Sequence, residues 1–378
     1  MNTSFLEVTA RDPIVARDGR PFGAGQNRMR ALAWPPPSLV AGSLRTALAK
    51  SANREFSDEN RRDLLDTEIT GVLPVADEEL HLPEPRDCVV HPDGRVLRTT
   101  PQPLKLGGWN LPAPLMPVQL TQAQAAEDFK PVNAPAWWPL AKYSEWLLGE
   151  DIVFDHRFLR APEVEQRMHV QLDPVSGAAE DRKLFSTAAL PLAFLRRYGS
   201  TTPPKFAQIN MTVRVRGNHW CGKAAATLNM LHPLGGERRL VHWKAISAAH
   251  VWACPPTLRE ALGKTKRIRM VLATPAIFRG GWKPGWLDGR LTGEPPGTDL
   301  TLTLVGVSIQ RWQAISGWSL AEPKGPKAIK RVVPAGGVYF FESARQSASA
   351  LCDRWLESVS DNEQDQRDGF GLAAWGIW

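Results

Sequence analysis

The stretch that decides the fold is PIVARDGRPFGAGQNRMRALAWPPPSLVAGSLRTALAK, residues 13–50. Residues 13–16 are predicted to end a strand, and Asp18-Gly19 is predicted as a turn because glycine accepts positive φ without steric cost. Three prolines at 35–37 keep the backbone extended, so a helix is expected to begin with Ser38 as its N-cap. One face of this helix is apolar, which predicts packing on a sheet. The face consists of Val40, Leu44, Ala47 and Leu48.

The same stretch is strongly basic, with six cations against the single acid Asp18. A glycine-rich basic loop between a strand end and a helix start brings free amides and guanidinium groups together, which predicts an anion site. Its ligand could be a phosphate, an RNA backbone or an acidic protein surface. An ordinary solvated loop is the alternative, because basic runs are common. The cations are Arg17, Arg20, Arg28, Arg30, Arg45 and Lys50.

The composition is that of a globular chain of about two or three domains. Of its 378 residues, 43% are hydrophobic and 22% are charged, which leaves enough apolar surface for sizeable cores. The formal net charge of +7 favours polyanionic partners but does not bear on the fold. The 15 tryptophans outnumber the 3 tyrosines, and most of them are expected in cores and protein interfaces.

Cysteine usage and hydropathy together predict a cytoplasmic location. The four cysteines include no CxxC pair, and the charged N-terminal region lacks the apolar core of a secretory signal. No run of 18 apolar residues is present, so no membrane span is expected. Free thiols in a reducing compartment are therefore predicted. The cysteines are Cys88, Cys221, Cys254 and Cys352.

Residues 165–187, EQRMHVQLDPVSGAAEDRKLFST, predict a β-hairpin. Polar and apolar residues alternate at the period of a strand from Arg167 to Leu172, and residues 174–177 turn the chain. A hairpin of this length could project as an arm with one apolar and one basic face. An amphipathic hairpin that lies on its own domain is the alternative.

The second half of the chain has its own set of predicted elements. Strands are expected at residues 268–274 and 300–309, and a helix is expected at residues 343–359. A short internal repeat relates residues 12–19 to residues 274–281, since each has a proline, an apolar run, an arginine and then glycine. This repeat suggests a duplicated unit.

The whole pattern predicts an α+β fold of two ferredoxin-like, RRM-like domains, because helices are interspersed among roughly antiparallel strands. The N-terminal domain is predicted at residues 1–217. It would carry a Pro- and Trp-rich insertion at about 101–139, packed by its own aromatics, and the hairpin arm at about 165–187. The C-terminal domain is predicted at residues 218–378 and ends in a glycine-rich loop.

No catalytic, metal or cofactor site is predicted from the residues. His156 is the best acid–base candidate, but it forms no compelling pair with a lysine or tyrosine, so a surface role is favoured. The histidines and cysteines at residues 219–254 match no standard zinc spacing. The sequence Gly23-x-Gly25-x-x-Arg28 lacks the third glycine of a dinucleotide fingerprint, and no Walker A sequence is present.

An ordered set of motifs resembles one known family. RDGRPFGAG and WPPPSLVAGSLRTAL, at the N-terminus, are similar to the N-terminal signature of the third subunit of the Cmr complex, the type III-B CRISPR effector. The similarity continues through RMHVQLDPVSGAAEDRKLFST, VLATPAIFRGGWKPGW, ISGWSL and PAGGVYFFES to RDGFGLAAWGIW, in the order of the family. This family belongs to the RAMP superfamily of RNA-binding proteins built from ferredoxin-like domains.

The resemblance implies an RNA-binding subunit without catalysis of its own. It would grip the 5′ repeat-derived tag of the CRISPR RNA (crRNA), beside the large polymerase/cyclase subunit and the first backbone subunit of the Cmr complex. The terminal glycine-rich loop is brief here, which weakens the transfer of RNA contacts to its glycines. The predicted RNA-binding residues are Arg17, Arg20, Gly23, Gly25, Arg28, Arg30, Ser43, Arg45, Arg167, His169, Arg279, Gly369 and Gly371.

Elementary chemistry agrees with this role. Sequence-tolerant RNA binding needs cations for phosphates, glycines for close backbone approach and planar groups for unstacked bases. Two other functions stay open at this point. One is a metal-independent endoribonuclease that processes CRISPR RNA through a histidine, and the other is a purely structural subunit that uses its tryptophans at protein interfaces.

Overall fold

The computed structural model describes residues 2–19, 28–104, 108, 110–196, 203, 205–217, 219–319, 324–345 and 347–378. It has a mixed α/β fold with antiparallel sheets, and it divides into two compact units, each assembled from three parts of the sequence. Unit 1 contains Met1–Thr67, Ala161–Ile246 and Gln313–Arg331. Unit 2 contains Glu68–Arg160, Ser247–Trp312 and Val332–Trp378.

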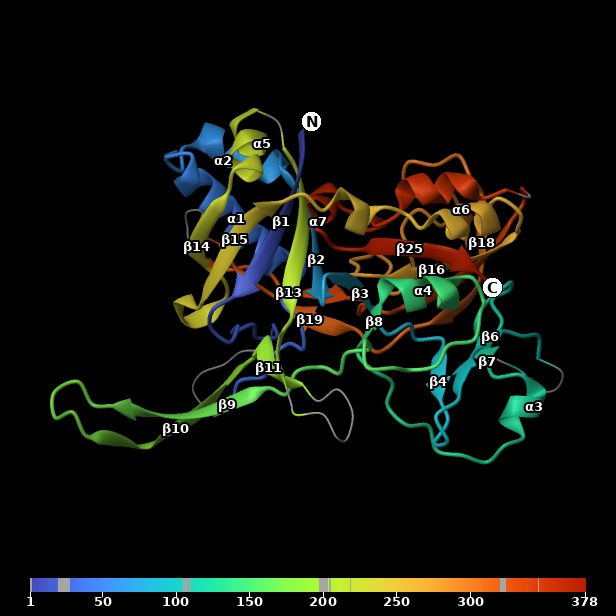
Figure 1. Ribbon diagram of the computed structural model, residues 1–378, viewed down its shortest axis with the longest axis horizontal. Coiled ribbons are helices and arrows are strands. Elements are labelled where there is room, and N and C mark those ends of the chain that lie inside the picture. Colours follow the sequence, from blue (N-terminus) through green and yellow to red (C-terminus); the bar gives the residue numbers. More distant parts are fainter. Residues whose placement is uncertain are drawn as a thin grey trace. The chain divides into compact units, whose positions relative to one another are not determined.

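Unit 1 is built on four neighbouring antiparallel strands of a larger sheet, in the order β14-β15-β1-β13. The strands are β1 (Asn2–Ala10), β13 (Asn210–Gly217), β14 (Asn229–Pro233) and β15 (Leu240–Ile246). Figure 1 shows β1 between β13 and β15. Leu6 and Val8 of β1 and Val213 of β13 are fully buried, as expected for the covered face of an antiparallel sheet.

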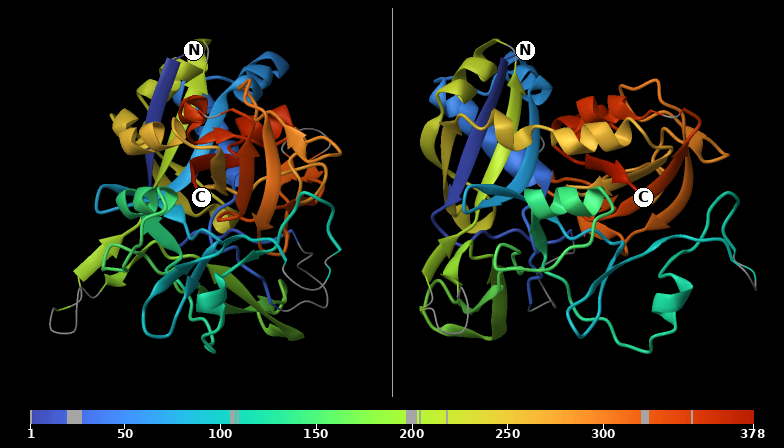
Figure 2. Two further views of the ribbon diagram at one scale, coloured as in Figure 1. Left: turned by 90° about the vertical axis from the view of Figure 1, so that its right-hand side faces the viewer. Right: turned by 45° about the vertical axis from the view of Figure 1, so that its right-hand side comes forward.

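Three helices accompany this sheet: α1 (Pro37–Ser51), α2 (Asp58–Asp66) and α5 (His219–Ala226). The apolar face predicted for α1 is buried, and α1 and α5 pack together beside the strands (Figures 1 and 2). Helix α1 has Pro36 as its N-cap and Pro37 in its first turn, without a side-chain cap, so the prediction of Ser38 as N-cap is wrong. Proline suits the first helical position because the missing N–H has no partner there.

Unit 1 also carries a long two-stranded ribbon made of β9 (Glu165–Leu172) and β10 (Ala179–Ala189), which confirms the predicted hairpin. In Figure 1 this ribbon extends away from the sheet of unit 1 as an arm. The remaining elements of unit 1 are short. They are β11 (Ala193–Arg196), β12 (Lys205–Gln208), η1 (Gly236–Arg238), β19 (Gln313–Ile315), β20 (Trp318–Ser319), β21 (Gly325–Pro326) and, at its boundary, β22 (Lys330–Val332).

Unit 2 is built on a six-stranded antiparallel sheet in the order β17-β18-β23-β16-β25-β24. Its strands are β16 (Arg267–Leu272), β17 (Thr292–Gly293), β18 (Leu302–Ser308), β23 (Val338–Ser343), β24 (Glu357–Ser358) and β25 (Leu372–Ile377). The helical elements of unit 2 are α3 (Gln122–Ala125), α4 (Leu140–Leu147), η2 (Ala249–Trp252), α6 (Pro256–Leu262), η3 (Ser349–Arg354) and α7 (Glu363–Arg367). The strands predicted at 268–274 and 300–309 correspond to β16 and β18, which are both largely buried.

A buried ion pair lies in the core of unit 2. The side chains of Arg269 in β16 and Asp87 are fully buried, and the Arg269 guanidinium donates hydrogen bonds to the Asp87 carboxylate and to the carbonyl of Trp146 in α4. The Trp146 indole donates a 3.0 Å hydrogen bond to the same carboxylate. A buried pair of this kind is tolerated because each charge has its counterion and further hydrogen bonds. It therefore joins three segments that are distant in the sequence.

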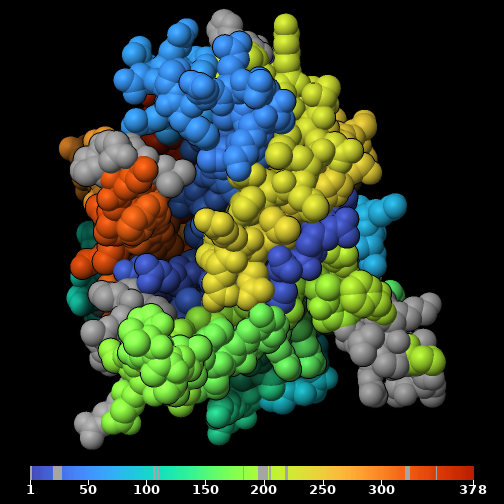
Figure 3. Space-filling model, turned by 90° about the vertical axis from the view of Figure 1, so that its left-hand side faces the viewer, coloured from blue at the N-terminus to red at the C-terminus, as the bar shows by residue number. Residues whose placement is uncertain are grey.

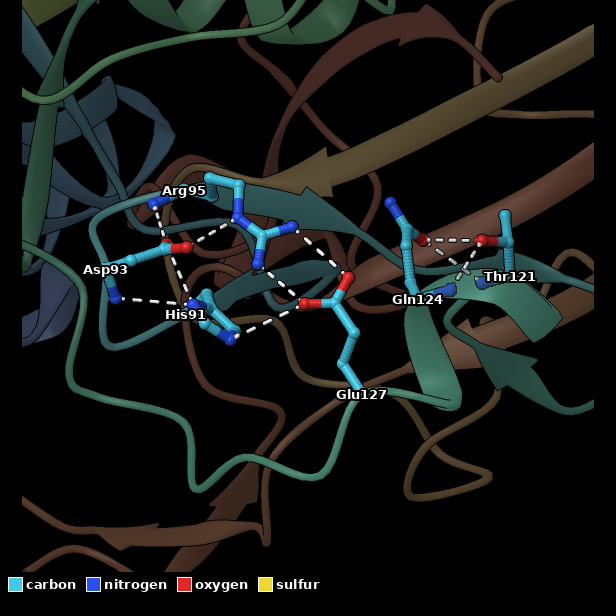
Figure 4. A network of polar contacts seen from close by, with 6 residues as sticks. All are labelled: His91, Asp93, Arg95, Thr121, Gln124 and Glu127. Carbon is cyan, nitrogen blue, oxygen red and sulfur yellow. Dashed lines mark hydrogen bonds and ion pairs between the residues drawn. The ribbon is translucent and has the colours of Figure 1, made fainter.

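The predicted insertion at about 101–139 is only partly irregular. Around it lie β2 (Glu68–Ala76), β3 (Glu79–Pro83), β4 (Cys88–Val90), β5 (Val96–Arg98), β6 (Thr100–Pro101), β7 (Val118–Gln119) and β8 (Trp137–Pro139). Arg95, in the turn between β4 and β5, forms 2.7 Å and 2.6 Å ion pairs with Asp93 and Glu127 (Figure 4). The backbone N–H of Arg95 and its guanidinium lower the pKa of Asp93 to about 2. This network fastens the insertion to the β4–β5 turn.

The internal repeat occupies equivalent places in the two units. Residues 12–19 follow β1, which lies between β13 and β15, and residues 274–281 follow β16, which lies between β23 and β25. In both cases the regular strand ends before the repeat, which then forms only isolated bridges. They involve Ile14, Val15 and Arg17 in the first copy and Ala276, Phe278, Gly280 and Gly281 in the second. The equivalence supports the duplication that the sequence suggested.

Two boundaries predicted from the sequence differ from the structure. The predicted domain boundary after residue 217 separates β13 from β15, although both strands pair with β1. Strand pairing thus keeps β14 and β15 in unit 1. The helix predicted at 343–359 is only the short η3 followed by β24, and Leu356 has a positive φ of 53° that no helix contains. Among the described residues, no helix is long and apolar enough to span a membrane.

Candidate nucleic-acid interface

Residues 14–18, the described start of the predicted anion site, are held in unit 1 by three other segments. The N–H of Asp18 donates to the carbonyl of Arg30 at 3.1 Å, and Arg17 forms an antiparallel bridge with Ala31. Ile14 exchanges backbone hydrogen bonds of 2.9 Å and 2.8 Å with Leu190. On the third side, Gly236 donates to the carbonyl of Val15. The site is therefore a convergence of segments and not a single loop.

The base of the hairpin arm joins the same framework. The N–H of Met29 donates a 2.9 Å hydrogen bond to the carbonyl of Ser186 in β10, and Arg28 forms a parallel bridge with Ser186. Ser186 in turn lies opposite Met168 of β9. Figure 3 shows blue atoms of the N-terminal segment and yellow atoms of the β14–β15 region above the green hairpin. The basic N-terminal stretch and the hairpin arm, which are far apart in the sequence, are thus adjacent.

A small apolar core explains how the arginines face outward. Val15, Met29, Ala188 and Ala189 are buried together, with Ala31 packed against them. Because side chains alternate along extended backbone, burial of Met29 turns its two neighbours outward. The residues that are exposed around this core are Arg17, Arg28 and Arg30.

Arg167 and His169 lie on β9 near the base of the arm. The Arg167 guanidinium donates a 2.7 Å hydrogen bond to Glu165, which lowers the pKa of Glu165. The ring of His169 stacks on Phe185 at 5.2 Å, and its Nε2 lies 2.8 Å from the Thr187 hydroxyl. Both side chains remain partly exposed, but each already has a partner within the arm.

The turn between β14 and β15 brings a further arginine that the sequence analysis missed. Arg238 is exposed, and the neighbouring Glu237 contributes to the electrostatic environment of Arg167. Gly235 has φ of 83°, and a Cβ there would lie 2.4 Å from the carbonyl oxygen of Val15, so only glycine permits this approach. The signal in the sequence was Gly-Gly-Glu-Arg-Arg at residues 235–239.

We call the resulting cluster in unit 1 the basic junction. Among the described residues, no ion pair involves Arg17, Arg28 or Arg30, so no carboxylate in this part of the chain neutralises their charge. Unpaired guanidinium groups on a fixed backbone are suited to phosphate oxygens. The members of the basic junction are Arg17, Arg28, Arg30, Arg167 and Arg238.

The remaining predicted residues of the N-terminal stretch differ in their placement. Ser43, on α1, donates a 2.7 Å hydrogen bond to the carbonyl of Pro233. Arg45 is buried, with 8% of its surface exposed, and donates to the backbone carbonyls of Leu64 and Thr67. The prediction that Arg45 contacts RNA is therefore wrong, because its guanidinium fastens α1 to the end of α2. Arg20, Gly23 and Gly25 lie outside the described residues.

The predicted residues of the second half lie in unit 2. Arg279 is exposed, and its backbone N–H donates a 2.7 Å hydrogen bond to the Asp361 carboxylate, which also accepts from the N–H of Gly285 at 2.7 Å. Asp361 thus fixes the loop that presents Arg279. Arg279 therefore belongs to unit 2, whereas the basic junction defined above lies in unit 1.

The terminal glycines have a structural role. Gly369 and Gly371 are buried, with φ of 89° and 72°. A Cβ on Gly369 would lie 2.6 Å from the carbonyl oxygen of Gly71, and one on Gly371 would lie 2.4 Å from the Ser360 hydroxyl. Their close approach is to the protein's own chain, so the prediction that they contact RNA is wrong.

The residues considered for catalysis or metal binding are dispersed. His156 is exposed in a loop of unit 2, beside the 2.7 Å ion pair of Arg157 with Asp155. His232 is buried beside the Thr46 hydroxyl at 2.9 Å, whereas His242 lies 2.7 Å from the Asn229 side chain. In the part of the chain that the structure describes, no group of three or more His, Cys, Asp or Glu side chains could hold a metal ion.

Comparison with solved structures finds distant likenesses. One chain of "Cryo-EM structure of the Type III-B Cmr-beta bound to cognate target RNA" is 13% identical, with a TM-score of 0.47, and the match covers 98% of this chain and 96% of that chain. A chain of the same assembly with target RNA and AMPPnP is 14% identical, with a TM-score of 0.44 and coverage of 89% and 86%. A chain of the "Csm3-Csm4 subcomplex in the type III-A CRISPR-Cas interference complex" is 8% identical, with a TM-score of 0.37 and coverage of 89% and 92%.

The family assignment rests on a sequence-family model and not on these distant structures. None of the curated proteins matches this chain. The model described as CRISPR-associated protein (Cas_Cmr3) matches residues 6–378, which is nearly the whole chain and includes every segment of the basic junction. The match confirms the resemblance that the ordered motifs indicated. The chain belongs to the Cas_Cmr3 family of CRISPR-associated proteins.

Proposed function

We propose that this chain is a non-catalytic, RNA-binding subunit of a type III-B CRISPR–Cas effector complex, and that its basic junction grips the 5′ repeat-derived tag of the crRNA. The observation that carries the proposal is the convergence of Arg17, Arg28 and Arg30 on one backbone framework at the base of the hairpin arm. Family membership supplies the biological setting, and the geometry supplies the binding chemistry.

The arrangement suits a single RNA strand. Guanidinium groups bind phosphate oxygens whatever the base sequence, so they supply affinity and position. Reading an unstacked base needs a planar group, and the stacked pair of His169 and Phe185 lies on the arm next to these cations. Phosphate contacts at the junction and base contacts on the arm would together hold a short tag in one register.

The proposed fold follows the RAMP superfamily. In unit 2 the four long strands run in the order β18-β23-β16-β25, so the first strand lies between the third and the fourth. This order supports a ferredoxin-like domain whose first crossover is a loop instead of a helix. In unit 1, β1 lies between strands that come much later in the chain, which supports the same reading.

The proposed partners are the large polymerase/cyclase subunit and the first backbone subunit of the complex. Exposed apolar side chains on the arm support a protein or RNA contact there. Large apolar side chains on a projecting ribbon are not covered by the rest of the chain, and exposed apolar surface of this kind is typical of interaction sites. Met168, Leu172 and Leu184 are 63%, 56% and 52% exposed.

RNA binding by the full chain at several salt concentrations tests the proposal. The probe is an RNA with the repeat-derived 5′ tag, compared with an RNA of equal length without it. Affinity for single-stranded RNA falls with salt at a slope of about −0.7 per phosphate neutralised. The variant Arg17→Ala/Arg28→Ala/Arg30→Ala is therefore expected to reduce the slope by about 2 and to weaken binding at low salt.

The matched control removes the same charge elsewhere in unit 1. Arg54 follows the C-terminal end of α1, a helix of 15 residues that spans about 22 Å, and Arg61 and Arg62 lie on α2; all three are exposed. Replacing these three by Ala is expected to leave the slope nearly unchanged. Equal slopes for the two variants would place the RNA site elsewhere, and equal affinity for both RNAs would refute the specificity for the tag. Incubation with the full chain in EDTA is expected to leave the tag RNA intact. Cleavage of this RNA by the wild type but not by His156→Ala would instead favour the metal-independent endoribonuclease.

A further inference from the structure

Two cysteines that are distant in the sequence meet at the surface of the unit 2 core. Cys254 lies just before α6 and is partly exposed, whereas Cys352 lies in η3 and is 4% exposed. Both thiols are free. Cys254 packs against the buried apolar cluster that contains Cys352, and its thiol donates a 3.7 Å hydrogen bond to the carbonyl of Pro255. In the sequence the four cysteines are far apart from one another, and only the fold brings these two close together.

The elements that carry the two thiols are firmly connected. Helix α6 packs against η3, as the gold and red segments show in Figures 1 and 2. The backbone N–H of Ala348 donates a 2.8 Å hydrogen bond to the carbonyl of Leu262, the last residue of α6. Arg259 of α6 donates a 2.7 Å hydrogen bond to Asp353, the residue after Cys352. The two thiols are therefore held close without a covalent bond.

The surroundings favour a thiolate on Cys352. The neighbouring Cys254 thiol is the main cause that lowers the pKa of Cys352, and the Arg259 guanidinium lowers it further. The nearby Cys352, together with burial, raises the pKa of Cys254. The other two cysteines differ, since burial raises the pKa of both Cys88 and Cys221. Thiolate character decides which cysteine reacts with an oxidant.

We propose that Cys254 and Cys352 form an oxidisable dithiol that a small hydroperoxide, such as hydrogen peroxide, converts into an intramolecular disulfide. A small oxidant is required because Cys352 is nearly buried. The disulfide would lock the start of α6 to η3. This site is separate from the basic junction, which lies in unit 1.

The reaction balances with one peroxide per dithiol. The Cys352 thiolate attacks one peroxide oxygen, the O–O bond breaks, and the leaving hydroxide takes a proton to become water. Cys352 is then a sulfenic acid. The Cys254 sulfur attacks the Cys352 sulfur, its proton passes to the departing hydroxyl group, and a second water leaves. Two electrons pass from the two sulfurs to the peroxide, and one S–S bond is formed.

Peptide mapping of the full chain after treatment with hydrogen peroxide tests this proposal. A peptide pair that joins Cys254 to Cys352, lighter by two hydrogen atoms than the two thiol peptides, is expected. Cys88 and Cys221 are expected to stay available for alkylation after unfolding. Because the disulfide closes a long loop, the melting temperature is expected to rise by roughly 5 °C or more, and a reductant should reverse the rise.

Variants separate the two steps. In Cys254→Ser the sulfenic acid on Cys352 has no second thiol, so a dimedone adduct on Cys352 is expected. Cys88→Ser is the control and should form the disulfide as the wild type does. If Cys254→Ser fails to fold, the wild-type peptide map still decides. Four free thiols in folded protein after oxidation would overturn the proposal, as would a disulfide that involves Cys88, Cys221 or a second chain.

Discussion

At the scale of single residues, the basic junction depends on where side chains are absent as much as on its arginines. Gly235 lets the β14–β15 turn approach Val15 so closely that a Cβ would overlap the carbonyl oxygen at 2.4 Å. That approach places Arg238 beside the segment that carries Arg17. The position of an arginine is thus set by a glycine three residues earlier.

Gly235→Ala is expected to destabilise the chain more than its positive φ alone requires. With φ of 83° and ψ of −162°, Gly235 lies in a region that is essentially restricted to glycine and costs another residue about 1–3 kcal/mol, and the steric overlap with Val15 adds to that. The matched control is Gly177→Ala at the tip of the arm, where φ is 67° but a Cβ would have nothing within 4 Å. Urea unfolding measures both variants. Equal losses of unfolding free energy would show that the close approach at Gly235 does not matter.

At the scale of elements, the hairpin arm has two parts with different roles. Its base shares hydrogen bonds and a small core with the basic junction. Its outer part, residues 171–183, is largely exposed and contains three acids and two bases. The outer part therefore contributes neither core packing nor a net positive charge.

Replacing residues 171–183 by Asn-Gly tests this division. Val170 and Leu184 lie opposite each other in the ribbon, so a two-residue turn can join them. The melting temperature is expected to change little, and the salt slope for RNA with the crRNA tag should stay that of the wild type, because the junction's cations remain. A clear loss of affinity with a smaller salt slope would instead place the RNA backbone along the outer arm.

At the scale of the whole molecule, each unit is assembled from separated parts of the chain. In unit 1, β1 is paired on one side by β13 and on the other by β15, which lies beyond residue 217. Strand β15 was not predicted from the sequence, and hydrophobic periodicity within a segment gives no information about which strands pair. Pairing between distant strands decides where a unit ends.

A fragment of residues 1–217 is consequently expected not to fold. It lacks β15, so one edge of the buried strand β1 would have no hydrogen-bond partners and would favour aggregation. Solubility and the cooperativity of thermal unfolding measure the outcome, with the full chain as the reference. A soluble fragment that unfolds cooperatively would contradict the division of the chain described here.

Much of the candidate site could be predicted from local sequence. The alternation in residues 165–172 predicted the arm, and the basic stretch after Pro13 predicted exposed cations at Arg17, Arg28 and Arg30. Arg45 misled the prediction because a helix pattern does not tell which arginine turns inward to cap backbone carbonyls. The prediction for Gly369 and Gly371 was wrong because a glycine-rich sequence indicates close approach of another group but does not tell whether that group is RNA or protein.

The sequence by itself determined the family, the alternation of strands and helices, and the basic character of the N-terminal segment, since these depend on residues near one another in the chain. Tertiary structure alone decided that this segment meets the arm and the β14–β15 turn, that Arg45 is buried, and that Cys254 reaches Cys352. Those features depend on contacts between distant segments, and such contacts are fixed by strand pairing and core packing that local patterns do not encode.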